Sequence, residues 1–206
     1  MTIVTIGGLY DTYDAAAQTV RELEALPVPS GDISLVAHRN GHDGVANETW
    51  NEAEAGAEIG ASAGGLLGGG AGLLAGLGIM AIPGVGPVVA AGWLVATAAG
   101  AVVGIVAGGA AGGLIGSLTS AGVGTDQAHF YAEGIRRGGA LVTARVDESS
   151  TQAVEAIMRR HGRIHATARG KIYRDGGWRE FDETSPPLNQ AALEKERTLY
   201  QSGPLV

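Results

Sequence analysis

One stretch of 67 residues, from Ile59 to Thr125, contains no charged side chain and constrains the fold more than any other feature. Within it glycine recurs every fourth residue in two runs. Residues four apart lie on one face of an α-helix, so each run predicts a helix with a groove that lacks side chains. The predicted helix-packing glycines are Gly60, Gly64, Gly68, Gly72, Gly76, Gly92, Gly100, Gly104, Gly108, Gly112 and Gly116.

The two runs together predict an antiparallel helical hairpin, with helices over Glu58–Ile82 and Val88–Ser120. The short connection between them contains the turn-forming residues Pro83, Gly84, Gly86 and Pro87, which are assigned to the hairpin turn. Such grooves let helix backbones approach closely, as in small-xxx-small packing, so we expect a glycine zipper. A repeat of four exceeds 3.6 residues per turn and favours a right-handed crossing.

Glycine in a helix costs about 1 kcal/mol per residue relative to alanine, and this cost limits the environments in which the hairpin can be stable. Either a lipid bilayer or tight oligomeric packing out of water must offset that cost. Helices of about 37 and 50 Å would exceed a hydrocarbon core of about 30 Å. The acidic flanks, with Glu52, Glu54, Glu58 and Asp126, give only a weak positive-inside signal. We therefore expect membrane insertion, with a soluble self-assembled core as the alternative.

The amino-acid composition argues against several classes of function. The net charge is −7 and the first lysine is Lys171, which argues against a nucleic-acid partner. The absence of cysteine excludes disulfides and thiol catalysis. The segment Met1–Val4 does not resemble a cleavable signal. A two-span hairpin would then leave the remaining domain and both termini in the cytoplasm.

The segment before the glycine-rich stretch predicts a β-α-β unit. Thr2–Gly7 and Asp32–Ala37 are rich in β-branched and apolar residues and are expected to be strands. Apolar residues between them recur at helical spacing. Asp11 or Thr12 is expected to cap this helix.

A second β-α-β unit is predicted after the stretch, preceded by a short amphipathic helix over Asp126–Arg137. Its strands are expected at Ala140–Val146 and Arg163–Ala168. The helix between them is expected to be capped by Asp147 or Ser149 and to end at Gly162.

Two such units predict an α+β fold, a ferredoxin-like split β-α-β sandwich of four antiparallel strands interrupted by the long antiparallel glycine-zipper hairpin. Residues 1–51 form the first half of the sandwich with a loop, and 52–122 form the hairpin. Residues 123–169 form the second half, and 170–206 form a C-terminal arm.

The arm concentrates the aromatic residues Tyr173, Trp178 and Phe181 around the Gly176-Gly177 turn. Two interpretations stay open. These side chains dock onto their own chain, or they contact a neighbouring subunit, since aromatic residues with arginine suit an interface.

The sequence resembles the bacterial general stress proteins of the heat- and low-temperature-induced families. The likeness lies in GGLYDTYDAAAQTVRELEALPVPSGDISLVAHR at residues 7–39, in AHFYAEGIRRGGALVTARVD at 128–147, and in AIPGVGPVVAAGW at 81–93. The last segment is similar to the hairpin turn of glycine-zipper, membrane-associated members. The resemblance covers residues 2–168 and implies a stress-associated, non-catalytic protein. It carries over no catalytic residues.

Three polar clusters were weighed as sites. His38, His42 and Asp43 have a spacing that could ligate a metal ion, but the glycines around them indicate a polar loop. A second cluster, Asp126, His129 and Glu133, is best interpreted as a helix N-terminus capped by Asp126.

The third cluster is basic and joins His161 and His165 with Arg159, Arg160 and Arg163. It could meet lipid headgroups or the acidic segment of a neighbour, although a solvated surface is the simpler interpretation. We assign no catalytic, metal or cofactor residues. The sequence therefore predicts a non-enzymatic, stress-associated structural protein that inserts its hairpin into a membrane and forms a homo-oligomer. The alternative is a soluble particle whose zippers share a dry core. Small-molecule sensing by the sheet is a further class that rests on analogy alone.

Overall fold

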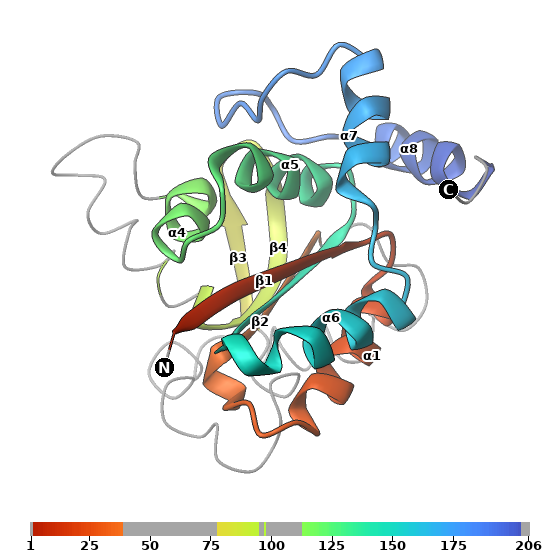
Figure 1. Ribbon diagram of the computed structural model, residues 1–206. Helices are drawn as coiled ribbons and strands as arrows, with labels where there is room; N and C mark the ends of the chain where they lie inside the picture. Colours follow the sequence, from red (N-terminus) through yellow and green to blue (C-terminus); the bar gives the residue numbers. More distant parts are fainter. Residues whose placement is uncertain (1, 39–77, 95–96, 98–112, 203–206) are drawn as a thin grey trace, which may run out of the picture.

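A five-stranded antiparallel sheet forms the centre of the computed structural model, which describes residues 2–38, 78–94, 97 and 113–202 (Figure 1). The protein is α+β, as expected. The strand order is β1-β5-β2-β4-β3. The strands are β1 (Ile3–Tyr10), β2 (Ile33–His38), β3 (Gly78–Ile82), β4 (Gly86–Gly92) and β5 (Ala140–Asp147).

The first β-α-β unit forms as the sequence predicts. Helix α1 (Tyr13–Glu24) connects β1 to β2, by way of a short 3₁₀ turn η1 (Ser30–Asp32). Of the two expected caps, Thr12 is the one used, and its Oγ1 accepts a hydrogen bond from the Ala15 N–H at 3.2 Å. Strand β5 lies between β1 and β2 and pairs antiparallel with both.

Helix α6 (Thr151–Arg160) follows β5, and the chain leaves the helix at Gly162, whose φ of +78° is the left-handed conformation expected of a helix stop. The expected cap is wrong. A 3₁₀ turn, η4 (Glu148–Ser150), intervenes, and the residue at the N-cap is Ser150, without a side-chain capping bond.

Helices cover both faces of the sheet. On one face α1 and α6 contribute apolar side chains to a cluster that includes Val20, Leu23 and Met158. On the other face α4 (Leu114–Ser120) and α5 (Thr125–Arg136) pack over a second cluster that includes Leu118 and Ile135. The sheet is therefore the middle of three layers (Figure 1).

The expected last strand, Arg163–Ala168, is wrong. Helix α7 (Ala166–Asp175) begins within it, because Gly170 and Tyr173 bury one side of a helix at a spacing of three residues. A backbone hydrogen bond from the Ile164 N–H to the Leu9 oxygen at 2.8 Å joins this segment to the edge of β1.

The prediction of a helical hairpin is wrong for residues 78–82 and 86–92, because these residues form strands β3 and β4. These strands pair with each other, and β4 pairs with β2 from Ser34↔Gly92 to His38↔Val88. Alternate side chains of β4 enter the two cores, with Val88 on one face and Val89 on the other. Pairing with β2 thus overrides the four-residue glycine pattern. The segment Pro83–Val85 is a turn, but it joins two strands.

Gly92 was predicted to line a helix groove, and the structure gives it another role. Its φ is +90°, and a Cβ atom there would lie 2.0 Å from the Ile33 carbonyl oxygen, so only glycine permits this approach of β4 to β2. Gly116 lies in α4, which ends at Ser120 as the expected second helix does. The other predicted packing glycines, Gly60, Gly64, Gly68, Gly72, Gly76, Gly100, Gly104, Gly108 and Gly112, lie outside the described residues. Among the described residues, no helix combines the length and apolarity that a membrane crossing requires.

Candidate functional site

The C-terminal end folds back over its own chain (Figure 1). It consists of α7, a connecting segment over residues 176–189, and α8 (Gln190–Ser202). Tyr173 and Phe181 are 1% and 5% exposed and belong to the core cluster beneath α5. This burial agrees with the interpretation that these two side chains dock onto their own chain, and their contact with a neighbouring subunit stays a prediction. Trp178 is half-buried, with its ring edge-on to Tyr173 at 5.8 Å, and its contact with a neighbour stays a prediction.

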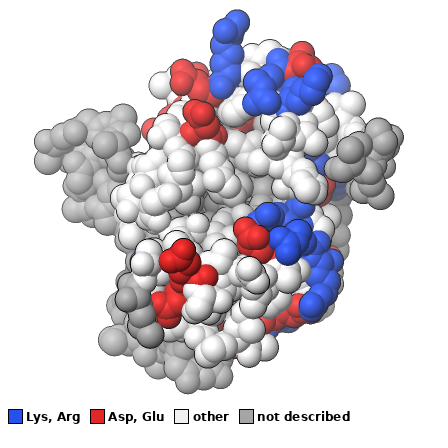
Figure 2. All heavy atoms as spheres, in the orientation of Figure 1, with Lys and Arg blue, Asp and Glu red and all other residues white. Residues whose placement is uncertain are grey.

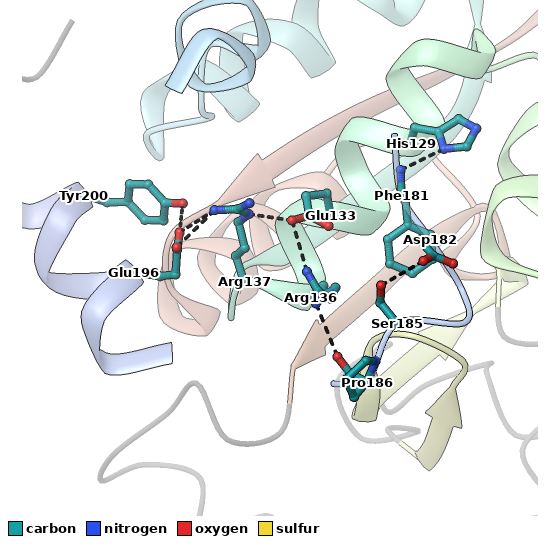
Figure 3. A network of polar contacts seen from close by, with 10 residues as sticks. All are labelled: His129, Glu133, Arg136, Arg137, Phe181, Asp182, Ser185, Pro186, Glu196 and Tyr200. Carbon is teal, nitrogen blue, oxygen red and sulfur yellow. Dashed lines mark hydrogen bonds and ion pairs between the residues drawn. The ribbon is translucent and has the colours of Figure 1, made fainter. Parts of the chain in front are cut away.

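The connecting segment lies directly on α5 and on the β3–β4 turn. The Phe181 N–H donates to Nδ1 of His129 at 3.1 Å, and Nη2 of Arg136 donates to the Pro186 oxygen at 3.3 Å (Figure 3). Gly84 has a φ of +74°, and a Cβ atom there would lie 2.8 Å from the Asp182 oxygen. The turn predicted as the far tip of a membrane hairpin is therefore covered by the protein's own C-terminal segment.

A buried ion-pair network joins α5 to α8 (Figure 3). Its centre is Glu133, which is 2% exposed and accepts a hydrogen bond from Nε of Arg137 at 2.6 Å. Nη1 of Arg137 donates to both carboxylate oxygens of Glu196 at 3.0 Å. The Tyr200 hydroxyl donates to the same carboxylate, and Arg136 contacts Glu133 at 3.4 Å. The carboxylates of Glu133 and Glu196 thus both pair with the guanidinium of Arg137, as charged groups withdrawn from solvent require.

Burial and charge set the protonation states of this network. Burial raises the pKa of Glu133, and the nearby Arg137 offsets only part of that rise. Burial also opposes the charge of Arg137, but Glu133 and Glu196 outweigh it and raise its pKa. Burial raises the pKa of Tyr173 to about 12 and raises that of Tyr200 as well. Arg137 is therefore cationic and both phenols are neutral near pH 7.

A cavity of about 80 Å³ lies beside this network, where β1 and its following turn meet α5, α7 and α8. Arg169 forms two hydrogen bonds with Asp11, at 2.7 and 3.0 Å, and its guanidinium stacks on the Tyr200 ring at 3.7 Å. Arg137 stacks on the Tyr173 ring at 4.5 Å. The cavity is lined by Leu9, Asp11, Thr12, Gly134, Arg137, Gly138, Gly139, Ile164, Arg169, Tyr173, Leu193, Arg197 and Tyr200.

The structure describes one member of the first predicted polar cluster and all three of the second. His38 is buried near the β3–β4 turn, and burial lowers its pKa, while His42 and Asp43 lie outside the described residues. In the other cluster, the N-cap of α5 is Gly124 rather than Asp126, so that cap was wrong. Its remaining members have different partners, since His129 contacts Phe181 and Glu133 contacts Arg137. In the described part of the chain, no three His, Asp or Glu side chains are grouped to hold a metal ion.

Acidic partners largely offset the predicted basic cluster. Arg160 pairs with Glu22 of α1 at 2.8 Å, and Arg159 pairs with Glu155 at 3.1 Å. His161 lies 3.2 Å from the same Glu22. In the view of Figure 2, acidic side chains lie beside the basic ones. The solvated surface is thus the better interpretation.

The network around Glu133 was not predicted from the sequence. A local signal exists, because Glu133 and Arg137, like Glu196 and Tyr200, are four residues apart on a helix. The link between these two pairs spans 59 residues and leaves no local pattern. Asp11 and Arg169 are 158 residues apart, and their pairing leaves no local pattern either.

No family model, no curated protein and no solved structure matches this chain.

Proposed function

We propose that this protein is a non-enzymatic, stress-associated structural protein that self-associates into a homo-oligomer through the glycine-rich segments on either side of the β3–β4 hairpin. The association with stress rests on the resemblance of residues 2–168 to bacterial general stress proteins. Self-association rests on the four-residue glycine repeat, which suits close packing between backbones.

The observation that supports the proposal is the pairing of β4 with β2. It joins residues 78–92 to the same sheet as β2, while α4 packs on that sheet through Leu114 and Leu118. Both ends of each glycine-rich segment are thereby attached to one folded body. A segment attached at both ends would have to cross a bilayer twice.

Chain length then favours packing between proteins over a bilayer crossing. The uncharged part of the first segment, residues 59–77, contains 19 residues, and the second, 98–112, contains 15. The second segment, attached at both ends, would reach only about 11 Å as a helix that leaves and returns, half of its helical length. The first would need a second crossing through residues 39–58, which carry the charged residues Arg39, Asp43, Glu48, Glu52, Glu54 and Glu58. A hydrocarbon core is about 30 Å thick. We therefore favour the particle with a shared dry core over the two-span membrane hairpin.

Light scattering after size-exclusion chromatography tests self-association on the full chain. We expect one defined oligomer. The double substitution Gly68→Leu and Gly108→Leu should shift it towards monomer, because leucine prevents close approach of the backbones. The matched control is Gly69→Leu with Gly109→Leu, which adds the same side chains one position out of the repeat. Circular dichroism verifies that both variants keep the α+β fold.

Two outcomes contradict the proposal. One is a monomer at every concentration of the unaltered protein, and the other is an equal loss of assembly in the variant and its control. Flotation with liposomes separates the membrane alternative. Co-flotation that depends on Gly68 and Gly108 would favour insertion into lipid, whereas an oligomer that stays with the soluble fraction supports the particle.

A further inference from the structure

We propose that helix α8 is a strap that detaches from α5 and α7 and returns to them while the sheet stays folded. The ion pair between Glu196 and Arg137 is the latch of this strap. The device does not rest on the glycine-rich segments, since the residues involved all belong to the described α+β body. Three observations carry it: how charges are shared at the interface of α8, how little apolar packing holds that helix, and where the chain before it is fixed.

The two charged groups of the latch each have a second partner on their own side of the interface. Arg137 of α5 pairs with Glu133 of the same helix at 2.6 Å, and with Glu196 of α8 at 3.0 Å (Figure 3). Glu196 also accepts a hydrogen bond from the Tyr200 hydroxyl of α8. When α8 detaches, Arg137 therefore keeps Glu133, and Glu196 keeps Tyr200. Breaking an ion pair is costly when it leaves a buried charge alone, and this separation leaves neither charge alone.

The contact between Arg169 and α8 is divided in the same way. Arg169 of α7 stacks on the Tyr200 ring at 3.7 Å. It also forms two hydrogen bonds with Asp11, at 2.7 and 3.0 Å. Asp11 directly follows β1 and stays with the body, so Arg169 remains paired after Tyr200 has left.

Apolar packing contributes little to the attachment of α8. Among residues 190–200, whose side chains the structure describes, Leu193 is the one that is buried, at 2% exposed, whereas Leu199 is 52% exposed. The cavity of about 80 Å³ lies between α8 and the body formed by β1, α5 and α7. Atoms that line a void lose the contacts that a filled space would give them. The stabilisation from buried apolar area is therefore small along this helix.

The chain is fixed immediately before α8. A Cβ atom at Gly86 would lie 3.0 Å from Cβ of Pro187, so Pro187 packs on the β3–β4 turn. The Oδ1 atom of Asn189 accepts a hydrogen bond from the Ala192 N–H at 2.9 Å and caps the helix. The strap therefore turns away from the body at residues 188–189. Once detached, a helix of 13 residues is marginal in water, so its amide protons exchange with solvent.

Detachment of α8 exposes the surface of α5 and α7 that it covers. Tyr173, whose ring lies 6.4 Å from that of Tyr200, is 1% exposed while α8 is in place. Arg137 stacks on the Tyr173 ring at 4.5 Å, and both line the cavity. The strap thus controls the access of solvent and of other molecules to a surface with an aromatic and a cationic group.

Amide hydrogen exchange of the full chain, followed by mass spectrometry, tests the proposal. We expect residues 190–202 to exchange at least about tenfold faster than β2 and β5, because α8 detaches without unfolding of the sheet. An increase in sodium chloride from about 0.1 to 1 M should speed the exchange of α8 about threefold, since salt screens the latch.

Glu196→Gln removes the charge of the latch and should speed exchange in α8 about tenfold. Glu194→Gln is the matched control, because it makes the same chemical change at an exposed position of the same helix. It should change the rate less than about twofold. In every sample the rates of β2 and β5 show whether the sheet stays folded.

Three outcomes overturn the proposal. In the first, α8 exchanges as slowly as β2 and β5 in the unaltered protein, so that it opens only when the whole chain unfolds. In the second, Glu196→Gln and Glu194→Gln change the exchange of α8 equally. In the third, Glu196→Gln speeds exchange in the two strands as much as in α8, which would make α8 part of one cooperative unit with the sheet.

Discussion

The two faces of the sheet are held together by different kinds of interaction. The face under α1 and α6 is packed with apolar side chains such as Val20, Leu23 and Met158, and the ion pairs of Glu22 lie at its exposed rim. The face under α5 also has an apolar core. It additionally buries Glu133, and it binds the distant helix α8 through a chain of charged groups.

This difference predicts which kind of substitution destabilises each face. Apolar packing has no preferred direction, and its stabilisation scales with buried area. A buried ion pair is close to neutral while both partners are present, and it becomes costly when one is removed. The α5 face should therefore respond to charge and pH, whereas the α1/α6 face should respond to volume.

The largest expected effect comes from a substitution that disrupts the sheet itself, which both faces share. Strand β4 supplies Val88 to one face and Val89 to the other. In Gly92→Val the new Cβ atom would lie 2.0 Å from the Ile33 oxygen, at a φ of +90°. We expect a loss of about 4 kcal/mol or more in the free energy of unfolding, measured by urea denaturation.

Gly122→Val is the matched control for this substitution. Gly122 has a φ of +89°, and a Cβ atom there would meet nothing within 4 Å. It carries the backbone strain alone, which costs about 1–3 kcal/mol. Equal losses in the two variants would contradict the close approach of β4 to β2 and would reopen the helical interpretation of this segment.

The second prediction tests the charged face directly. Arg137→Met leaves Glu133 buried and without its nearest partner, so we expect a loss of about 3–5 kcal/mol in the free energy of unfolding. The double substitution Arg137→Met with Glu133→Met should recover most of that loss, because it removes both charges. If the single and double variants are equally stable, the pair is not a coupled buried unit.

The sequence predicted the first β-α-β unit well because local signals agree there. Thr12 is a good cap, helical spacing matches the buried residues of α1, and the apolar run before His38 matches a strand that is buried along its whole length. Residues 86–92 mislead because a short apolar run suits either a helix or a buried strand. The backbone edge of β2 decides between them, and β2 lies far away in the sequence.

The same argument explains the last predicted strand and the site. Residues 163–168 alternate in polarity, but burial of Tyr173 against Phe130 of α5 selects a helix instead. In the cavity, Asp11 and Arg169 meet only after β1 and α7 are placed. Sequence spacing reveals pairs within one helix, such as Glu133 with Arg137. It does not reveal which helices will lie side by side.

The third prediction concerns the pH dependence of the free energy of unfolding. Burial lowers the pKa of His38, which lies near Gly86 on the side covered by the C-terminal segment. The unfolded chain takes up a proton near pH 6.5 and the folded chain does not, so this contribution to stability is complete above that pH and falls below it. Between pH 7 and 5.5 we expect the free energy of unfolding to decrease by at most about 1.2 kcal/mol, the limit for one group that titrates near pH 6.5 in the unfolded chain alone.

The variant His38→Asn removes the titrating group and should flatten this dependence. Glu133 does not produce the same slope, because its raised pKa has the opposite sign: its contribution is present at low pH and is lost as the pH rises. A slope that persists in His38→Asn would assign the pH dependence to other groups.

The smallest effect is expected at the rim of the apolar face. Arg160 is 64% exposed where it meets Glu22, so solvent screens the pair and its formation restricts two flexible side chains. We expect Arg160→Gln to change the free energy of unfolding by less than about 1 kcal/mol in urea denaturation, and by still less at high salt. Leu23→Ala, in the same layer but fully buried, should cost about 2–5 kcal/mol at either salt concentration. If Arg160→Gln instead costs as much as Leu23→Ala, the α1/α6 face also depends on charge, and the two faces differ less than their burial indicates.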